Sequence, residues 1–287
     1  MSSRDHESHK KLRQNLHKHW YSFAMPAVGK LVCALSRVLH HGGSALPGKV
    51  IESLDSGFLA RTLASLPYGI VLISGTNGKT TTTRMVTSML RDAGLNVFTN
   101  PTGSNFTRGV VASLAKIMPA FGTKLNADIA VLELDEAYAV HFVNQIKPRY
   151  SLLLNVMRDQ LDRFGEIDTT AKLLSNVAAA TEGTVVLNRE DSRICALAKV
   201  VPSGTCVRYF GLDDAVKSMF PTDDDLHNTA EKSENCKDTA ESKANNLPKA
   251  DVVLSKVGDH EAEFILDGKS KTTSVKLDGA YNIFNAA

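Results

Sequence analysis

The hydrophobic pattern of this chain alternates between short apolar runs, which predict buried strands, and longer stretches in which apolar residues recur at helical spacing. The strands are expected at Gly69–Ser74, Asn96–Thr99, Asp128–Leu134, Tyr150–Asn155, Thr184–Leu187 and Cys206–Tyr209. Helices are expected at Val50–Leu66, from Lys79 onward, at Thr107–Met118 and at Thr169–Ala180. The alternation predicts an α/β fold, in which a mostly parallel sheet is flanked by helices on both faces.

The C-terminal part of the pattern differs from the rest. Asp251–Lys256 and Glu261–Leu266 predict an antiparallel β hairpin, and Thr272–Leu277 predicts a further strand. In parallel sheets, ligands bind beyond the carboxyl ends of the strands. The polar residues that follow the predicted strands are therefore the first place to look for a functional site.

Changes in composition divide the chain into regions. Residues 1–48 combine a basic arm, an amphipathic helix and a loop, and residues 49–287 are expected to form one nucleotide-binding domain. Within that domain, residues 213–250 are polar enough to predict a poorly ordered insertion. The N-terminal helix would place four apolar residues on one face: Leu31, Leu35, Val38 and Leu39. Two interpretations are open, a helix packed on the domain or a basic amphipathic contact with an anionic membrane surface.

Composition excludes several classes of protein. The 287 residues carry 33 Lys and Arg against 31 Asp and Glu, a net charge of +2 that gives no reason to expect nucleic acid. The four cysteines have no CxxC spacing, so neither a disulfide framework nor a zinc site is expected. Lys30 and Arg37 interrupt the apolar stretch that follows Trp20, which argues against a transmembrane segment. We expect a cytoplasmic protein. If the N-terminal helix contacts an anionic membrane surface, the protein would also lie at the inner face of the plasma membrane.

The strongest local motif lies between the first strand and its helix, at Gly75-Thr76-Asn77-Gly78-Lys79-Thr80-Thr81. Glycines allow the backbone N–H groups to turn toward a phosphate, and the helix N-terminus adds a partial positive charge. Lys79 would reach the outer phosphates, and Thr80 is placed to bind magnesium. Ile73 stands where the general phosphate-loop pattern has its first glycine, so a chance glycine turn is the competing interpretation. The apolar face of the helix is expected at Val86, Met89, Leu90 and Ala93.

Carboxylates follow two of the other predicted strands. Glu133 is the first choice to face Thr80 across a Mg²⁺ ion, and Asp135 is the second. A solvated acidic strand end is the alternative. The segment Asn155–Arg163 gathers an amide, two carboxylates and two guanidinium groups, which suits a metal, a phosphate or an acceptor carboxylate, or else a structural Arg–Asp network.

Several motifs together resemble the Mur ligase superfamily of ATP-dependent amide-forming ligases. They are the phosphate loop, Gly43–Lys49, Glu133–Ala137, Arg158–Glu166 and Gly279–Ala287. Within the superfamily, the combination looks like the MurT family, the ligase-like subunits of lipid II isoglutaminyl synthases. The resemblance implies roles for Lys79 at phosphate, Thr80 and Glu133 at Mg²⁺, and Asn282 at adenine. It also implies a catalytic role for Asp159 in the Arg158–Glu166 motif.

By this resemblance, the protein would bind ATP and Mg²⁺ and activate the D-glutamate α-carboxyl of the lipid II stem peptide as an acyl phosphate. Ammonia from a GatD-type glutaminase would then form D-isoglutamine. Gln160 stands where amino-acid-adding Mur ligases have a histidine, which favours the MurT family. Of a four-cysteine zinc ribbon found in many of its members, only Cys236 is present, so no zinc is expected.

The resemblance also predicts that a C-terminal ligase domain is missing after Ala287. Two alternatives to the amidating subunit therefore stay open. One is an amino-acid-adding Mur or folylpolyglutamate-type ligase, and the other is a truncated nucleotide-binding protein without turnover.

Overall fold

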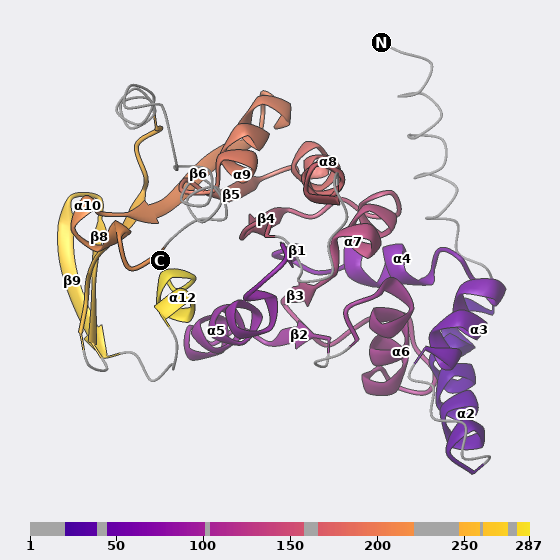
Figure 1. The fold of residues 1–287 in the computed structure, drawn as a ribbon. Helices are drawn as coiled ribbons and strands as arrows, with labels where there is room; N and C mark the ends of the chain where they lie inside the picture. Colours follow the sequence, from indigo (N-terminus) through magenta and orange to yellow (C-terminus); the bar gives the residue numbers. More distant parts are fainter. Residues whose placement is uncertain are drawn as a thin grey trace.

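A single nine-stranded sheet organises the fold. The computed structural model describes residues 21–38, 45–100, 104–157, 166–220, 247–258, 261–274 and 280–287. Its strands are β1 (Ile70–Ser74), β2 (Val97–Thr99), β3 (Ile129–Glu133), β4 (Tyr150–Leu153), β5 (Thr184–Asn188), β6 (Cys206–Leu212), β7 (Val252–Val257), β8 (Glu261–Leu266) and β9 (Lys269–Ser274). They lie in the order β2-β3-β1-β4-β5-β6-β7-β8-β9 (Figure 1).

The pairing confirms the predicted fold class. Neighbouring strands are parallel from β2 to β7, whereas β8 pairs antiparallel with β7 and β9. The first strand lies between β3 and β4, so the chain passes from one side of β1 to the other after β3. Ligands of open α/β sheets bind where the strand order reverses in this way. The carboxyl ends of β1, β3 and β4 are therefore brought together.

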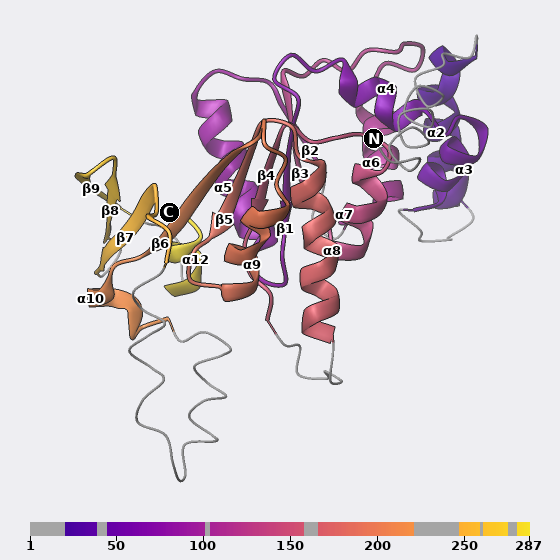
Figure 2. The same ribbon diagram turned by 90° about the horizontal axis from the view of Figure 1, so that it is seen from above.

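Helices cover both faces of the sheet (Figures 1 and 2). One face carries α4 (Phe58–Ala64), α6 (Thr107–Ile117), α7 (Glu136–Val143), α8 (Glu166–Ala180) and α9 (Ser192–Ala196), with α2 (Met25–Val38) and α3 (Leu46–Leu54) outside α6. The other face carries α5 (Lys79–Asp92), α10 (Asp214–Lys217) and α12 (Ala280–Phe284). Each face has its own apolar core, the larger one under α6, α7 and α8 and the smaller one under α5 and α12.

The predicted helix Val50–Leu66 is in fact two helices, which is a correction to the sequence reading. The α3 helix ends at Leu54, and Asp55 adopts a non-helical backbone with φ of −147°. The buried carboxylate of Asp55 pairs with the guanidinium of Arg61 in the next helix. This ion pair needs the turn between the two helices, and apolar spacing alone does not reveal it.

The face that α5 turns toward the sheet agrees only in part with the prediction. Met89 is 59% exposed and Ala93 is exposed, although both were expected on the buried face. The buried residues of α5 are instead three threonines: Thr82, Thr83 and Thr87. The phosphate loop sets the rotation of the first helical turn, so Thr83 and Thr87 follow Thr80 on one side of the helix. Val86 and Leu90 pack against the smaller core as predicted, so the prediction is wrong only for Met89 and Ala93.

The apolar face predicted for the N-terminal helix is its outward face. Leu31, Leu35 and Val38 are 61%, 52% and 75% exposed, while Leu39 lies outside the described residues. The opposite side of α2 packs closely, because a Cβ on Gly29 would approach Ala115 Cβ to 2.6 Å. The buried residues of α2 are Met25, Pro26, Gly29 and Ser36.

The segment predicted as an insertion is described only at its two ends. Residues 213–220 include α10, and Val216 and Phe220 are buried in the smaller core. Residues 247–250 lead into β7, where Ala250 is buried. Residues 221–246 lie outside the described part of the chain. The segment 213–250 is thus polar overall, but residues at both of its ends contribute to the core.

Candidate functional site

The loop between β1 and α5 has the backbone geometry of a phosphate-binding turn. Gly75 and Gly78 have φ values of 136° and 87°, a region that side chains other than glycine rarely adopt. A Cβ on Gly78 would lie 2.1 Å from Nδ2 of Asn285, and one on Gly75 would lie 3.0 Å from the backbone of Asn155. Only glycine fits at these two positions. The first turn of α5 then points its free backbone N–H groups into the loop.

Asn155, at the carboxyl end of β4, holds this loop in place. Its carbonyl accepts a hydrogen bond from Thr76 N at 2.9 Å, and its side-chain Oδ1 accepts one from Asn77 N at 2.9 Å. Its Nδ2 donates to the carbonyl of Asn77 at 3.0 Å. The sequence placed Asn155 at a strand end but did not show that it supports the loop. Its signal was an amide directly after a strand that neighbours β1.

Replacing Asn155 with alanine is expected to lower the free energy of unfolding by about 1–3 kcal/mol, because two hydrogen bonds to loop backbone groups are lost. Urea denaturation measures this change. Asn144→Ala removes an exposed amide at the end of α7 and serves as the matched control. Equal stability of the two variants would show that Asn155 does not hold the loop.

Lys79 lies over the loop. Its Nζ donates to the carbonyl of Gly75 at 2.6 Å and to that of Thr76 at 3.1 Å, and lies 3.3 Å from the carboxylate of Asp135. Asp135 itself accepts a hydrogen bond from Asn105 Nδ2 at 2.6 Å. The ammonium group is thus held beside the loop amides, where it adds to the positive potential of the helix N-terminus.

Thr80 and Glu133 are brought together, as the sequence predicted for a metal-binding pair. The hydroxyl of Thr80 donates to Oε1 of Glu133 at 2.8 Å, and Glu133 is only 6% exposed. Asn100 clamps the backbone of Glu133 from both sides, with Oδ1 accepting from its N at 3.0 Å and Nδ2 donating to its O at 2.9 Å. Octahedral Mg²⁺ with oxygen ligands at about 2.0–2.1 Å places adjacent ligands about 2.9 Å apart. The two oxygens therefore fit one Mg²⁺ ion.

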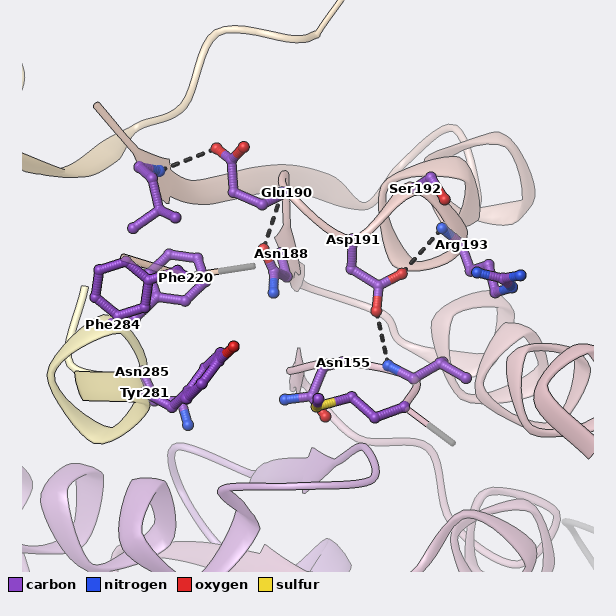
Figure 3. A pocket seen from close by; sticks show the side chains of 13 residues that line it. Asn155, Asn188, Glu190, Asp191, Ser192, Arg193, Phe220, Tyr281, Phe284 and Asn285 are labelled. Carbon is purple, nitrogen blue, oxygen red and sulfur yellow. Dashed lines mark hydrogen bonds between the residues drawn. The ribbon is translucent and has the colours of Figure 1, made fainter. Parts of the chain in front are cut away.

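A pocket, here called the aromatic pocket, lies beside Asn155 on the side of the loop away from Thr80 and Glu133 (Figure 3). Asn155, Asn188 and Asp191 form one wall, and the aromatic side chains of Phe220, Tyr281 and Phe284 face them. Phe220 contacts both other rings, with centroids 5.7 Å apart in each pair. An aromatic wall opposite polar groups suits a planar heterocycle with polar edges.

Asp191 makes the polar wall rigid. Its carboxylate accepts hydrogen bonds from Arg193 N and Ile194 N, which caps α9, and from Val156 N at 2.7 Å (Figure 3). Burial raises the pKa of the Asp191 carboxyl above its ordinary value, and the three backbone donors oppose that shift. Asp191 is thus the N-cap residue of α9. Asn188 has a similar structural role, because its Nδ2 donates to the carbonyl of Leu154 at 2.8 Å.

The structure thus brings together most of the predicted site. Gly75–Thr81 and Glu133 form one cluster around the loop. Asn282 lies on α12 beside Tyr281, but it is not among the described residues that line the aromatic pocket, whereas Tyr281 and Asn285 are. Asp159, with most of the Arg158–Glu166 motif, lies outside the described residues. The aromatic wall was missed because Phe220 and Tyr281 are distant in sequence from the loop.

Comparison with known proteins agrees with this geometry. The family model described as the Mur ligase middle domain matches residues 73–287. The chain belongs to the Mur ligase family. The resemblance found in the sequence motifs is therefore confirmed.

Two relatives share the same name. The lipid II isoglutaminyl synthase (glutamine-hydrolyzing) subunit MurT of Streptococcus pneumoniae (strain ATCC BAA-255 / R6) is 32% identical over 267 residues, which cover 85% of this chain and 56% of that protein. The subunit of the same name from Staphylococcus aureus (strain COL) is 32% identical over 64% of this chain and 40% of its own length. The chain spans about half the length of the curated relatives it matches.

Solved structures show the same fold. MurF ligase from Thermotoga maritima in complex with ADP matches with a TM-score of 0.57 and 19% identity, covering 82% of this chain and 47% of that one. A MurF structure from Acinetobacter baumannii also gives a TM-score of 0.57, with 17% identity over 84% of this chain and 44% of that one. At these identities the likeness concerns the fold.

Within the described residues, no helix has the length and apolar character needed to span a bilayer. The same residues contain no group of three or more His, Cys, Asp or Glu side chains arranged to hold a metal ion. Cys236, the remaining position of the zinc-ribbon motif, lies outside the described residues.

Proposed function

We propose that this chain is the ATP-binding part of a ligase that amidates lipid II in peptidoglycan synthesis. The observation that carries the proposal is the cluster of Lys79, Thr80 and Glu133 at the phosphate loop of a Mur ligase fold. The names of the MurT relatives support lipid II as the substrate and glutamine as the nitrogen donor. The group amidated would be the D-glutamate α-carboxyl of the stem peptide, which becomes D-isoglutamine.

ATP and Mg²⁺ fit the residues of this site. The loop amides and Lys79 would hold the β- and γ-phosphates, and Thr80 and Glu133 would hold Mg²⁺. The ion would supply charge neutralisation at the transferring phosphoryl group. Adenine would lie against Tyr281 and Asn285, and Asn282 on the same helix stays the adenine contact that the family resemblance implies.

The proposed reaction has two steps. A carboxylate oxygen of D-glutamate attacks the γ-phosphorus, and the bond from that phosphorus to the bridging oxygen breaks, so that ADP leaves and an acyl phosphate forms. Ammonia then attacks the acyl carbon, inorganic phosphate leaves and the nitrogen loses a proton. Lys79 would stabilise the charge on the transferring group by position and electrostatics, since phosphoryl transfer needs little covalent participation by the protein. Asp159 stays a predicted catalytic residue.

The nitrogen source would be a separate glutaminase of the GatD type. The word "subunit" in the names of the relatives supports a complex with another chain. Ammonia is a neutral nucleophile, so it can displace phosphate from the acyl phosphate without an added base on this chain. We therefore propose a heterodimer in which the partner releases ammonia from glutamine.

Mass spectrometry of lipid II tests the proposal. The protein is incubated with lipid II, ATP, Mg²⁺, glutamine and the glutaminase, and the expected product has one carboxyl group converted to a carboxamide. Addition of an amino acid residue instead would favour an amino-acid-adding ligase. That alternative has support in the 31% identity over 160 residues to a UDP-N-acetylmuramoylalanine–D-glutamate ligase of Paraburkholderia phymatum (strain DSM 17167 / CIP 108236 / LMG 21445 / STM815), which covers 55% of this chain and 30% of that one. ATP binding with unchanged lipid II would favour a nucleotide-binding protein without turnover.

We further propose that the protein is cytoplasmic and works at the inner face of the plasma membrane, where a lipid-linked substrate is available. The exposed apolar stripe of α2, formed by Leu31, Leu35 and Val38, supports this localisation. The sequence before α2 is rich in basic residues: Arg4, Lys10, Lys11, Arg13 and Lys18. Basic residues beside an apolar face favour anionic lipid surfaces.

Replacing Leu31 and Leu35 together with glutamine is expected to weaken binding to phosphatidylglycerol vesicles by about tenfold or more, because two exposed apolar side chains no longer enter the interface. Vesicle sedimentation measures the bound fraction. Met89→Gln changes an equally exposed apolar residue on α5 and is the control. If the double variant sediments like the original chain, α2 is not a membrane contact.

A further inference from the structure

A polar cleft of about 420 Å³ lies along α5, on the side that faces β2. It begins at Thr80 and Glu133, the proposed metal-binding pair, and reaches Arg91 near the end of the helix. From Thr80 to Arg91 the helix rises about 16 Å, at about 1.5 Å per residue. The cleft is therefore a groove that leads away from the phosphate loop, on the opposite side from the aromatic pocket.

The wall of the cleft contains buried hydroxyl groups that lack a partner. Thr83 and Thr87 are 5% and 4% exposed, and neither Oγ1 has a hydrogen-bond partner within the described structure. The same is true of Oγ1 of Thr99 on β2, across the cleft. Thr82, one position earlier on α5, behaves as helical threonines usually do, donating to the carbonyl of Gly78 at 2.9 Å. Because buried polar groups are normally paired, three unpaired hydroxyls on one cleft point to a ligand.

The charges of the cleft select the kind of ligand. Arg84 and Arg91 lie on the same stripe of α5 as Thr80, Thr83 and Thr87, since all are separated by three or four residues. Guanidinium groups match phosphate and carboxylate in shape and charge. Two carboxylates also line the cleft, Asp92 at its far end and Glu133 at the loop. Glu133 accepts a hydrogen bond from Thr80.

We propose that this cleft binds a part of the ligase substrate that extends away from the reacting carboxyl, a chain of amide and hydroxyl groups that carries an oxyanion. The inference rests on the proposed function, because it takes lipid II as the substrate. Arg84 and Arg91 pair with the oxyanion, and Thr83, Thr87 and Thr99 hydrogen-bond to the amide or hydroxyl groups. The oxyanion is either the pyrophosphate of lipid II or the terminal carboxylate of its stem peptide.

The test uses the 287-residue chain saturated with Mg²⁺ and a non-hydrolysable ATP analogue, so that the phosphate loop is filled. Calorimetric titration with a short-chain lipid II analogue, with free stem peptide and with inorganic pyrophosphate measures binding to the cleft. The double variant Thr83→Val and Thr87→Val keeps the side-chain shape and removes the hydroxyls. We expect its affinity for the lipid II analogue to fall about tenfold or more, with unchanged ATP-analogue affinity and unchanged or higher thermal stability.

The arginine variants distinguish the two sources of the oxyanion. Arg84→Gln with Arg91→Gln is expected to abolish binding of pyrophosphate if that group is the anion, or binding of the free stem peptide if its carboxylate is. Arg37→Gln, which changes an exposed side chain on α2, is the control. Unchanged affinity for the lipid II analogue in both double variants would overturn the proposal. So would the absence of binding of every probe to a chain that binds the ATP analogue. A cleft that binds lipid II without amidation would instead count against the proposed function.

Discussion

Replacing Lys79 with alanine is expected to weaken ATP binding by about 30-fold or more, because hydrogen bonds to charged groups are worth about 1.5–3 kcal/mol each. In the structure the ammonium group rests on the carbonyls of Gly75 and Thr76 and beside Asp135. These contacts hold it where the outer phosphates would come. Calorimetric titration of the chain with ATP and Mg²⁺ measures the change.

The control for this variant is Lys147→Ala. Lys147 also pairs with a carboxylate, that of Glu182 at 3.6 Å, but both side chains are exposed, and Lys147 precedes β4 at the edge of the sheet opposite the loop. An exposed pair of this kind contributes little to stability. We expect the control to bind ATP like the original chain. Equal affinity in the Lys79 variant would show that the loop does not bind phosphate in the proposed way.

Replacing Glu133 with glutamine is expected to remove most of the dependence of ATP affinity on Mg²⁺, a loss of about 10- to 100-fold in the presence of the ion. Glutamine keeps the size of the side chain and an oxygen that can accept from Thr80, but it has lost the charge that a hard cation prefers. Folding stability should therefore change little. Titration with ATP in the presence and absence of Mg²⁺ separates the metal effect from nucleotide binding itself.

Glu136→Gln provides the matched control for this variant. Glu136 follows the same strand and begins α7, but it is not held against Thr80. We expect the control to keep the full effect of Mg²⁺. If Glu133→Gln and Glu136→Gln respond to the ion alike, the metal lies elsewhere.

Much of the fold could be predicted because its strands are short apolar runs with few polar interruptions. The run before Gly75 and the run before Glu133 are buried along nearly their whole length, as parallel strands between two helical layers must be. Thr80 and Glu133 both follow such runs, so their proximity could be predicted from the sequence. Parallel pairing puts the strand ends at one edge, so the site follows from the topology.

The features that were missed depend on contacts that sequence spacing does not encode. The break after Leu54 exists because Asp55 turns inward to Arg61. The buried side of α5 is set by the loop, so Met89 faces outward although its spacing matches an apolar face. Asn155 supports the loop from β4 through hydrogen bonds that span 78 positions in the chain. Such long-range polar contacts leave no periodic pattern.

A crystal structure of this chain with Mg²⁺ and a non-hydrolysable ATP analogue would show whether the Gly75–Thr80 loop, Glu133 and α12 form one Mg²⁺–ATP site. We expect phosphates against the loop amides and Lys79, with a cation between Thr80 and Glu133 in place of their hydrogen bond. We expect adenine beside Tyr281. A nucleotide bound elsewhere, or a cation that leaves the hydrogen bond from Thr80 to Glu133 intact, would contradict this arrangement.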